Sequence, residues 1–484
     1  MKEQRTLVGY LPDERPSFGK ALLFALQQFL VMLPATVLAV IIMNGMGGEA
    51  FPVGIYSIPA TIIASGVATI CFLLITRGKI PLYYGSSFSY IPAVGIVLTA
   101  AATRSVDNIT TLGAIIIASI VSGLMSIGAG LLIKKFGKEK IDKILPGHIT
   151  GMIAMIIGLS LAGNTMNGII FNAAQVDWLS VLVAMITFLT IAILTVALRK
   201  GFISQIPILL GLGVGVIFSY AIWVPFSPNA GGFVNYFSAI KAAETVRLLD
   251  VMPWNTIPAA FKDWELIGIA VIAIFPIAFA TIPESAAHVN QIDLYVNDLA
   301  SQRPEKKDYG IRHMLDDNLI GDGIGDIVAV VLGGPAGTNY GENVSASAVT
   351  KNFSSFVFFL TGILAVVVGI LLEVFQIGDI SLLLTQPVIQ GVSLYLFGAI
   401  AVQGIALMVD KKIDIFNPRV IAVMAFIGIV GLGIGSIQVT PTFVLPGIGL
   451  AAFGGIVINL LLQLIEKQVQ KFKAKREQKL DVIE

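Results

Sequence analysis

Charged residues are scarce in this sequence. Of its 484 residues, only 13% are Asp, Glu, Lys or Arg, whereas a soluble chain carries roughly 25%. The net charge is +1, so no excess of positive charge indicates nucleic acid as a partner. The single cysteine, Cys71, lies in an apolar run. With no second cysteine to pair with, it excludes a disulfide framework within the chain.

Long polar stretches are few: the first twenty residues, a basic connection at 303–313 and the tail after residue 466 are the main ones. Hydrophobic residues make up 56% of the chain, and they form runs of eighteen or more from end to end. Each run is long enough to cross a bilayer core of roughly 30 Å. The runs are continuous instead of alternating, which excludes a β-barrel, and the first is too long for a cleaved signal peptide. We therefore expect an all-α polytopic membrane protein, with the lipid bilayer as its surroundings.

The apolar runs predict about fourteen membrane segments. Lys and Arg are concentrated in alternate connections, which places both termini in the cytoplasm by the positive-inside rule. We expect a cytoplasmic segment at 1–19, an external connection at 227–264 and a basic cytoplasmic tail at 467–484. The predicted segments are 20–44, 53–76, 80–103, 112–134, 148–165, 178–198, 203–226, 265–290, 319–333, 340–351, 354–374, 387–409, 418–436 and 443–466.

Two of these stretches are interrupted by glycine and polar residues. "YYGSSFSY" (83–90) and "NYGENVSA" (339–346) are similar, and each occupies the third segment of its half. Seven segments per half reverse the direction of entry, so we predict an inverted repeat of 20–226 and 265–466. Irregular backbone at membrane depth needs protein or a cavity to satisfy its polar groups. We expect each stretch to form a short extended piece, followed by a half-helix, and the two extended pieces to pair near the midplane.

Few ionisable residues fall at membrane depth, where they are usually functional. Glu284 and His288 are four residues apart and share a helix face, and Glu342 lies in the second interrupted stretch. Asp322 and Asp326 form a second pair with this spacing. For Asp322, a helix cap or a cross-link between helices is the alternative to contact with a ligand. His288 alone would be read as a packed histidine, but the neighbouring Glu284 favours function.

The residue types in this set restrict the ligand. No Lys or Arg accompanies the carboxylates, which argues against an anion. Carboxylates with Asn, Ser and backbone donors suit a small neutral molecule with N–H and C=O groups, and Phe88 offers a stacking face. Pyrimidine and oxopurine bases fit, although a bare cation stays possible. Glu284 and His288 lack the third ligand of a metal site, so we expect no metal, no cofactor and no enzyme activity.

Several motifs together resemble the nucleobase–ascorbate transporter family (nucleobase:cation symporter type 2). The segment "NYGENVSASAVTK" is similar to its signature through Glu342, Asn343, Thr350 and Lys351. "PLYYGSSFSYIPA", "LPGHITGMIAMIIGLSLA", "IPESAAH" and "LQQFLVMLPATVL" resemble its third, fifth, eighth and first segments. The resemblance covers essentially the whole chain.

The resemblance implies a seven-plus-seven inverted repeat with two short antiparallel strands, in segments 3 and 10. Segments 1–4 and 8–11 would form a core domain, and segments 5–7 and 12–14 a gate domain. It also implies a homodimer in the cell membrane and proton-coupled uptake through Glu284 and His288, with the proton as coupling ion. The expected substrate-binding residues are Glu284, Glu342, Phe88, Gly341, Tyr340, Ser87 and Asn343.

Some positions depart from the family pattern. The histidine of the first segment is Gln28, the signature glycine is Ser345, and Asp326 has no expected counterpart. The Glu-Asn start of the signature is similar to that of uracil permeases, so uracil is the expected substrate. A purine permease for xanthine or guanine is the alternative. An anion transporter of the same architecture and a channel are further alternatives, and sodium coupling stays open.

Overall fold

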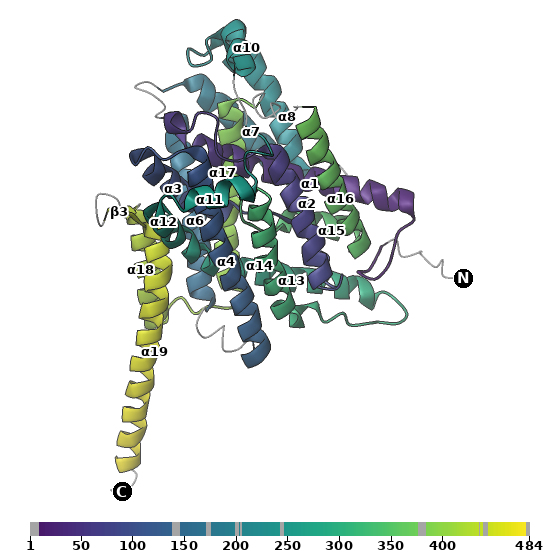
Figure 1. The fold of residues 1–484 in the computed structure, drawn as a ribbon. Helices are drawn as coiled ribbons and strands as arrows, with labels where there is room; N and C mark the ends of the chain where they lie inside the picture. The colour runs from purple at the N-terminus through teal and green to yellow at the C-terminus, as the bar shows by residue number, and fades with distance from the viewer. Residues whose placement is uncertain are drawn as a thin grey trace.

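The computed structural model describes residues 9–137, 146–170, 176–198, 203, 206–242, 246–375, 384–434, 436–438 and 444–480. Helices dominate it, and the last of them projects well beyond the rest of the molecule (Figure 1). The helices are α1 (Phe18–Gly45), α2 (Ile58–Ile75), α3 (Ile91–Thr103), α4 (Asn108–Phe136), α6 (Gly147–Ile170), α7 (Trp178–Ala197), α8 (Pro207–Phe218), α9 (Val224–Phe226), α10 (Gly232–Ala242), α11 (Pro253–Ala260), α12 (Trp264–Ile274), α13 (Ala278–Ser301), α14 (Leu315–Val331), α15 (Gly341–Thr350), α16 (Ser355–Val374), α17 (Gln386–Asp410), α18 (Pro418–Gly433) and α19 (Gly447–Leu480).

The helices agree with a protein that crosses a membrane many times. Within the described residues, nine helical stretches are long and apolar enough to span a bilayer, and three shorter apolar helices accompany them. The multi-pass character is therefore confirmed, while the count of fourteen segments stays a prediction. Two helices continue beyond the predicted membrane segments: α13 passes residue 290 and ends at Ser301, and α19 passes residue 466 and ends at Leu480. The membrane boundaries within these helices stay predictions.

Close helix packing in the interior is made possible by glycine. A Cβ atom built on Gly66 of α2 would lie 2.5 Å from the Gly362 oxygen in α16, and one built on Gly362 would lie 2.8 Å from the Gly66 oxygen. Gly123 of α4 and Gly323 of α14 show the same reciprocal relation, at 2.8 and 2.3 Å. Small residues let backbones in a membrane approach this closely. These contacts join helices of the first half of the chain to helices of the second.

The described residues contain four short strands, which form two antiparallel pairs. β1 (Tyr84–Ser86) pairs with β2 (Gly337–Asn339), as predicted for the two interrupted stretches. β3 (Ser436–Gln438) pairs with β4 (Val444–Pro446), which was not predicted. The sequence "SIQVTPTFVLP" (436–446) is rich in β-branched residues that favour strands, so the signal was present but was divided between two expected membrane segments.

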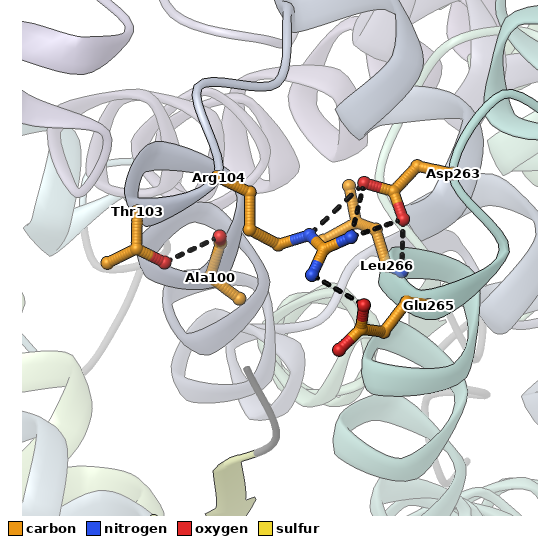
Figure 2. A network of polar contacts seen from close by, with 6 residues as sticks. All are labelled: Ala100, Thr103, Arg104, Asp263, Glu265 and Leu266. Atoms are coloured by element: carbon orange, nitrogen blue, oxygen red, sulfur yellow. Dashed lines mark hydrogen bonds and ion pairs between the residues drawn. The ribbon is translucent and has the colours of Figure 1, made fainter. Parts of the chain in front are cut away.

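A partly exposed cluster of ion pairs joins the end of α3 to the start of α12 (Figure 2). The Arg104 guanidinium donates to both carboxylate oxygens of Asp263, at 2.9 to 3.1 Å, and its Nη1 lies 2.7 Å from Glu265 Oε2. Asp263 also accepts from the Leu266 backbone N–H at 2.9 Å and so caps α12. Bidentate geometry makes such a pair stronger than an ordinary surface ion pair. It fixes the half-helix of the first interrupted stretch against the helix that leads into α13.

The residues before α1 form a strap across one end of the molecule. The Tyr10 N–H donates to the Lys351 oxygen at 2.9 Å, and the Phe353 N–H donates to the Tyr10 oxygen at 2.8 Å. On the other side, Arg303 Nη2 lies 3.1 Å from Glu14 Oε2. The strap therefore connects the turn after α15 to the loop after α13.

Candidate functional site

The site is built around the β1–β2 pair, whose register places Gly85 opposite Thr338. The ladder is extended by bonds from the Tyr340 N–H to the Tyr83 oxygen (2.9 Å) and from the Ser87 N–H to the Ala336 oxygen (3.1 Å). Because glycine has no side chain, Gly85 leaves space for the Tyr340 ring; a Cβ there would lie 2.4 Å from Tyr340 Cζ. Two extended segments thus satisfy each other's polar backbone deep in the protein.

The register corrects the alignment of the two interrupted stretches. The sequence comparison equated Gly85 with Gly341, but Gly85 is the central residue of β1 and Gly341 is the first residue of α15. A two-fold rotation about the centre of the antiparallel pair exchanges Gly85 with Thr338. The same rotation exchanges Ser89, four residues after Gly85, with Glu342, four residues after Thr338. The Tyr-Gly of the second stretch marks a helix start, whereas that of the first lies within a strand.

Each strand is followed directly by helix. Ser87 precedes the 3₁₀ turn η2 (Phe88–Tyr90), which continues into α3, and Tyr340 precedes α15. The N-terminal N–H groups of a helix lack partners within the helix and carry partial positive charge. The start of α15 therefore offers donors to a ligand beside the strand pair, whereas the Ser89 and Tyr90 N–H groups of η2 already donate to Ser87.

A cavity of about 540 Å³ lies beside these helix starts. Six of the eight predicted substrate-binding or proton-coupling residues line it. They come from η2, the loop after β2, α13 and α15, and they are Phe88, Glu284, His288, Tyr340, Gly341 and Glu342. The structure thus brings Glu284 and Glu342 together, although 58 positions separate them in the sequence.

Ser87 and Asn343 do not line the cavity. Ser87 Oγ accepts from the Ser89 N–H at 3.3 Å and so caps η2. Asn343 Nδ2 donates to Gln28 Oε1 (2.8 Å) and to the Gln28 backbone oxygen (2.9 Å). Gln28 Nε2 in turn donates to Ser347 Oγ at 2.9 Å. Gln28, at the position of the family histidine, therefore ties α1 to the helix that carries Glu342.

Three residues on the cavity wall have buried polar atoms without a partner. Within the described part of the chain, neither ring nitrogen of His288, nor Thr338 Oγ1, nor Asn339 Oδ1 is in hydrogen-bonding geometry with another group. His288 is only 2% exposed. Buried polar groups are nearly always satisfied, so each exception needs an explanation. A bound molecule with its own donors and acceptors would supply one.

Gly341 makes room for the histidine. A Cβ atom on Gly341 would lie 2.9 Å from His288 Nε2, which is closer than ordinary contact. The absence of a side chain lets the first turn of α15 approach the ring from α13. This close approach brings the Glu284–His288 face and Glu342 to the same cavity.

The two aspartates of α14 lie behind the strand pair. Asp322 accepts from Asn339 Nδ2 at 2.6 Å, from Asn318 Nδ2 at 3.3 Å and from Ser285 Oγ. It thereby cross-links α13, α14 and β2, which is the structural alternative raised for it. Asp326 accepts from Tyr84 and Gly337. Neither aspartate lines the cavity.

Several polar cavity residues were not predicted. Gln291 follows Glu284 and His288 on the same face of α13, at seven residues from Glu284, so its spacing could have indicated it. Tyr395 and Gln403 come from α17, whose apolar sequence gives no such signal. The unpredicted polar residues of the wall are Ser86, Ser89, Thr195, Gln291, Thr338, Asn339, Ser345, Tyr395 and Gln403.

A second cavity, of about 380 Å³, adjoins the first. Glu284, Gln291 and Gln403 line both. The second cavity reaches Asp410 and Lys411 at the end of α17. The site therefore continues toward the end of the molecule where basic connections are found.

Comparison with known proteins supports these findings. A family model described as "Permease family" matches residues 19–440. The chain is 30% identical over 456 residues to the uracil permease of Bacillus caldolyticus, which covers 93% of this chain and 94% of the relative. It is 32% identical over 416 residues to the uracil permease of Bacillus subtilis (strain 168), covering 83% and 85%. A putative pyrimidine permease, RutG, of Escherichia coli (strain K12) is 28% identical, covering 93% and 91%.

Solved structures show the same fold at low identity. The inward-facing structure of the murine Solute Carrier 26 family member A9 anion transporter matches with a TM-score of 0.61 at 11% identity, covering 94% of this chain and 69% of that one. The transmembrane domain of a cyanobacterial bicarbonate transporter, BicA, matches with a TM-score of 0.52 at 14% identity, covering 91% and 96%. The matched family model and the uracil permease relatives agree with the motifs of the sequence. The chain therefore belongs to this permease family, the nucleobase–ascorbate transporters, and is a multi-pass membrane transport protein and not an enzyme.

Proposed function

We propose that this protein takes up a nucleobase, uracil above others, by proton symport. The observation that carries the proposal is the composition of the central cavity. Two carboxyl groups, Glu284 and Glu342, face it together with the unpaired polar atoms of His288, Thr338 and Asn339. The described residues that line this cavity include no Lys or Arg. Such a wall suits a neutral ligand rich in N–H and C=O groups, and the relatives named as uracil permeases support this choice.

Recognition would use both helix starts. The ring N–H groups of the base would donate to Glu284 and Glu342, and a ring carbonyl would accept from backbone N–H groups at the start of α15. Phe88 would cover one face of the base. Its ring lies 5.8 Å, centroid to centroid, from Phe397 of α17 in an edge-to-face arrangement. A base that moves the Phe88 ring would through this contact also move Phe397 and so α17.

Proton coupling would act through the Glu284–His288 face. A proton taken up from outside would neutralise this pair before the base binds, because a buried negative charge without a partner is costly. Release of the proton on the inside would restore a buried negative charge without a partner, and the cost of that charge would destabilise the loaded site and allow the base to leave. The second cavity, which reaches Lys411, would serve as the route to the cytoplasm.

Alternating access would need two domains that move against each other. We propose that segments 1–4 and 8–11 form the core and segments 5–7 and 12–14 the gate, in an inverted repeat. The reciprocal glycine contacts support this arrangement. Exchanging the second segment with the ninth and the fourth with the eleventh turns the α2–α16 contact into the α14–α4 contact. If the two halves of the chain were not related by an inverted repeat, there would be no reason for the α2–α16 and α4–α14 contacts to use the same reciprocal glycine packing.

The remaining proposals concern the surroundings. We place the protein in the cell membrane, with both termini in the cytoplasm, as the basic connections indicate. A homodimer is proposed from the family resemblance. A xanthine or guanine permease is the alternative within transport. Anion transport, the activity named for the structural neighbours, is disfavoured by the two glutamates in the cavity.

The test is uptake of radiolabelled uracil by the purified protein in proteoliposomes, with and without an inward proton gradient. We expect saturable uptake that the gradient accelerates, and competition by unlabelled uracil in preference to xanthine, guanine and adenine. If uptake does not depend on the proton gradient but depends on a sodium gradient, the coupling ion is sodium and not the proton. Preferential competition by xanthine or guanine would move the assignment to a purine, and uptake of bicarbonate without any effect of bases would overturn it.

A further inference from the structure

Tyr84 and Asp326 form a buried contact that the transport mechanism above does not use. The Tyr84 hydroxyl donates to Asp326 Oδ1 at 2.5 Å. The Gly337 N–H lies 2.9 Å from the same carboxylate oxygen and 3.1 Å from the Tyr84 hydroxyl. One carboxylate oxygen of α14 therefore holds the first residue of β1 and the first residue of β2 at once.

The Tyr84 ring fits a slot between two glycines. A Cβ atom on Gly325 of α14 would lie 2.8 Å from Tyr84 Cε2, and one on Gly337 would lie 2.5 Å from Tyr84 Cε1. Tyr84 is 1% exposed and Asp326 is 2% exposed. With the ring enclosed by α14 and β2, its hydroxyl has a single direction in which to point. We call Tyr84, Asp326, Gly325 and Gly337 the strand lock.

The strand lock fixes the register of the strand pair. A slip by one residue would turn every side chain of a strand to the opposite face, and three-residue strands have few ladder bonds to resist it. Holding Gly337 from α14 sets where β2 begins and so where Tyr340 and Gly341, which follow the strand, lie. Holding Tyr84 sets the position of Phe88, four residues further along.

We propose that Tyr84 and Asp326 are positioning residues for the substrate, acting through the two strands. This inference rests on the proposed nucleobase function. Neither side chain lines the cavity, so neither touches the base. Their effect is to keep the Phe88 ring and the α15 start at the spacing of a single flat ring. A carboxylate suits this task because one oxygen accepts from a hydroxyl and a backbone N–H together, which an apolar residue could not do.

The experiment measures three quantities for each variant: the Kd for labelled uracil in detergent, the Tm, and hydrogen–deuterium exchange of the segments around β1 and β2. Asp326→Ala is expected to raise the Kd by about tenfold, the effect of roughly 1.4 kcal/mol. Asp326→Asn keeps an acceptor and is expected to restore most of the affinity. Tyr84→Phe keeps the ring in its slot and should raise the Kd less than Asp326→Ala. Combined with Asp326→Ala, Tyr84→Phe should add little, because both act through one contact.

Thr385→Val is the matched control. Thr385 is also buried, its hydroxyl shares a hydrogen bond of 2.6 Å with Ser219, and neither residue lines either cavity. Removing that hydroxyl should lower the Tm while the Kd changes less than about twofold. Faster exchange around both strands is expected for Asp326→Ala but not for Thr385→Val.

Two outcomes would overturn the inference. In the first, Asp326→Ala lowers the Tm but leaves the Kd within twofold of the unmodified protein, which would make the contact purely stabilising. In the second, exchange around β1 and β2 does not increase, which would refute the strand lock even if no base binds. Failure of the unmodified protein to bind any nucleobase would instead contradict the proposed function, and the exchange measurement separates the two cases.

Discussion

The two strand–helix units at the centre of the protein share a frame but differ in chemistry. Each consists of a three-residue strand that leads into a helix start, and the strands pair with each other. The corresponding first-turn positions are Ser89 in one unit and Glu342 in the other. The first unit supplies an aromatic face and a hydroxyl, and the second supplies the carboxyl. Two units of the same shape can thus present different chemistry to one cavity, since only a few side chains have to differ.

The largest expected effect separates these two corresponding positions. Glu342→Ala should abolish measurable uptake, because a lost charge-assisted hydrogen bond costs roughly 1.5–3 kcal/mol, about tenfold to a hundredfold in affinity. Ser89→Ala, at the matched place, should weaken binding by less than about fivefold, as a neutral bond contributes roughly 1 kcal/mol or less. Uptake of labelled uracil and its Kd are the measurements. Equal effects of the two changes would mean that the units are not chemically distinct.

The next prediction concerns the close approach of the second unit to α13. Gly341→Ala places a methyl group 2.9 Å from His288 Nε2, so the buried ring or the α15 start has to move. We expect the Kd for uracil to rise by about tenfold with a small loss of stability. Gly268→Ala in α12 is the control, since nothing lies within 4 Å of its added Cβ. Unchanged binding by Gly341→Ala would show that the spacing of α13 and α15 is not critical.

A smaller effect is expected in the first unit. Phe88→Leu keeps an apolar side chain on the cavity wall but removes the aromatic face and its edge contact with Phe397. Aromatic contacts of this kind contribute roughly 0.5–1.5 kcal/mol beyond their buried area, so the Kd should rise about twofold to tenfold. Titration with uracil measures this directly. A Kd that stays constant would exclude stacking on Phe88.

The smallest effect compares two helix caps outside the membrane-spanning helices. Asp177 caps α7 by accepting from the Leu179 N–H at 3.0 Å, and Asn417 caps α18 by accepting from the Arg419 N–H at 2.9 Å. Partial burial alone would raise the pKa of Asp177, but hydrogen bonds from Ser227, Ser180 and Trp223 outweigh it and hold the pKa below the ordinary value of 3.8. Only one of these two caps can therefore respond to pH.

Because the folded pKa of Asp177 is depressed, its contribution is present above about pH 3.8 and is lost as the pH falls through the folded pKa. Asp177→Asn should remove this part of the pH dependence and cost roughly 1 kcal/mol or less near neutrality, since the group is partly exposed. Thermal unfolding between pH 3 and pH 7 is the measurement. An identical loss of Tm on acidification in both proteins would show that Asp177 does not titrate with folding.

The sequence predicted those features of the site that a short stretch of residues reveals by itself. The interrupted stretches, the Glu284–His288 spacing and Glu342 were evident because polar residues are rare among apolar runs. The pairing of β1 with β2 followed from the need to satisfy backbone groups at membrane depth. The assignment of uracil and of proton coupling stays a prediction.

Contacts between residues far apart in the sequence could not be predicted from the sequence. Tyr84 and Asp326 are separated by 242 positions, and nothing near either residue indicates its partner. Asn343 belongs to the recognised signature, yet its side chain is directed to Gln28 of α1. Tyr395 and Gln403 enter the cavity only because α17 packs beside it. The three-residue offset between the stretches arose because Tyr-Gly serves in a strand once and at a helix start once.

The strap formed by the residues before α1 has a practical consequence for anyone who handles this protein. Tyr10 is hydrogen-bonded to both sides of the turn that ends α15, and Glu14 forms an ion pair with Arg303 beyond the end of α13. A fused tag, a proteolytic cut or a crosslink placed ahead of Phe18 would therefore disturb contacts to both helices that carry the glutamates. Affinity handles belong at the other end of the chain, where α19 runs clear of the body (Figure 1).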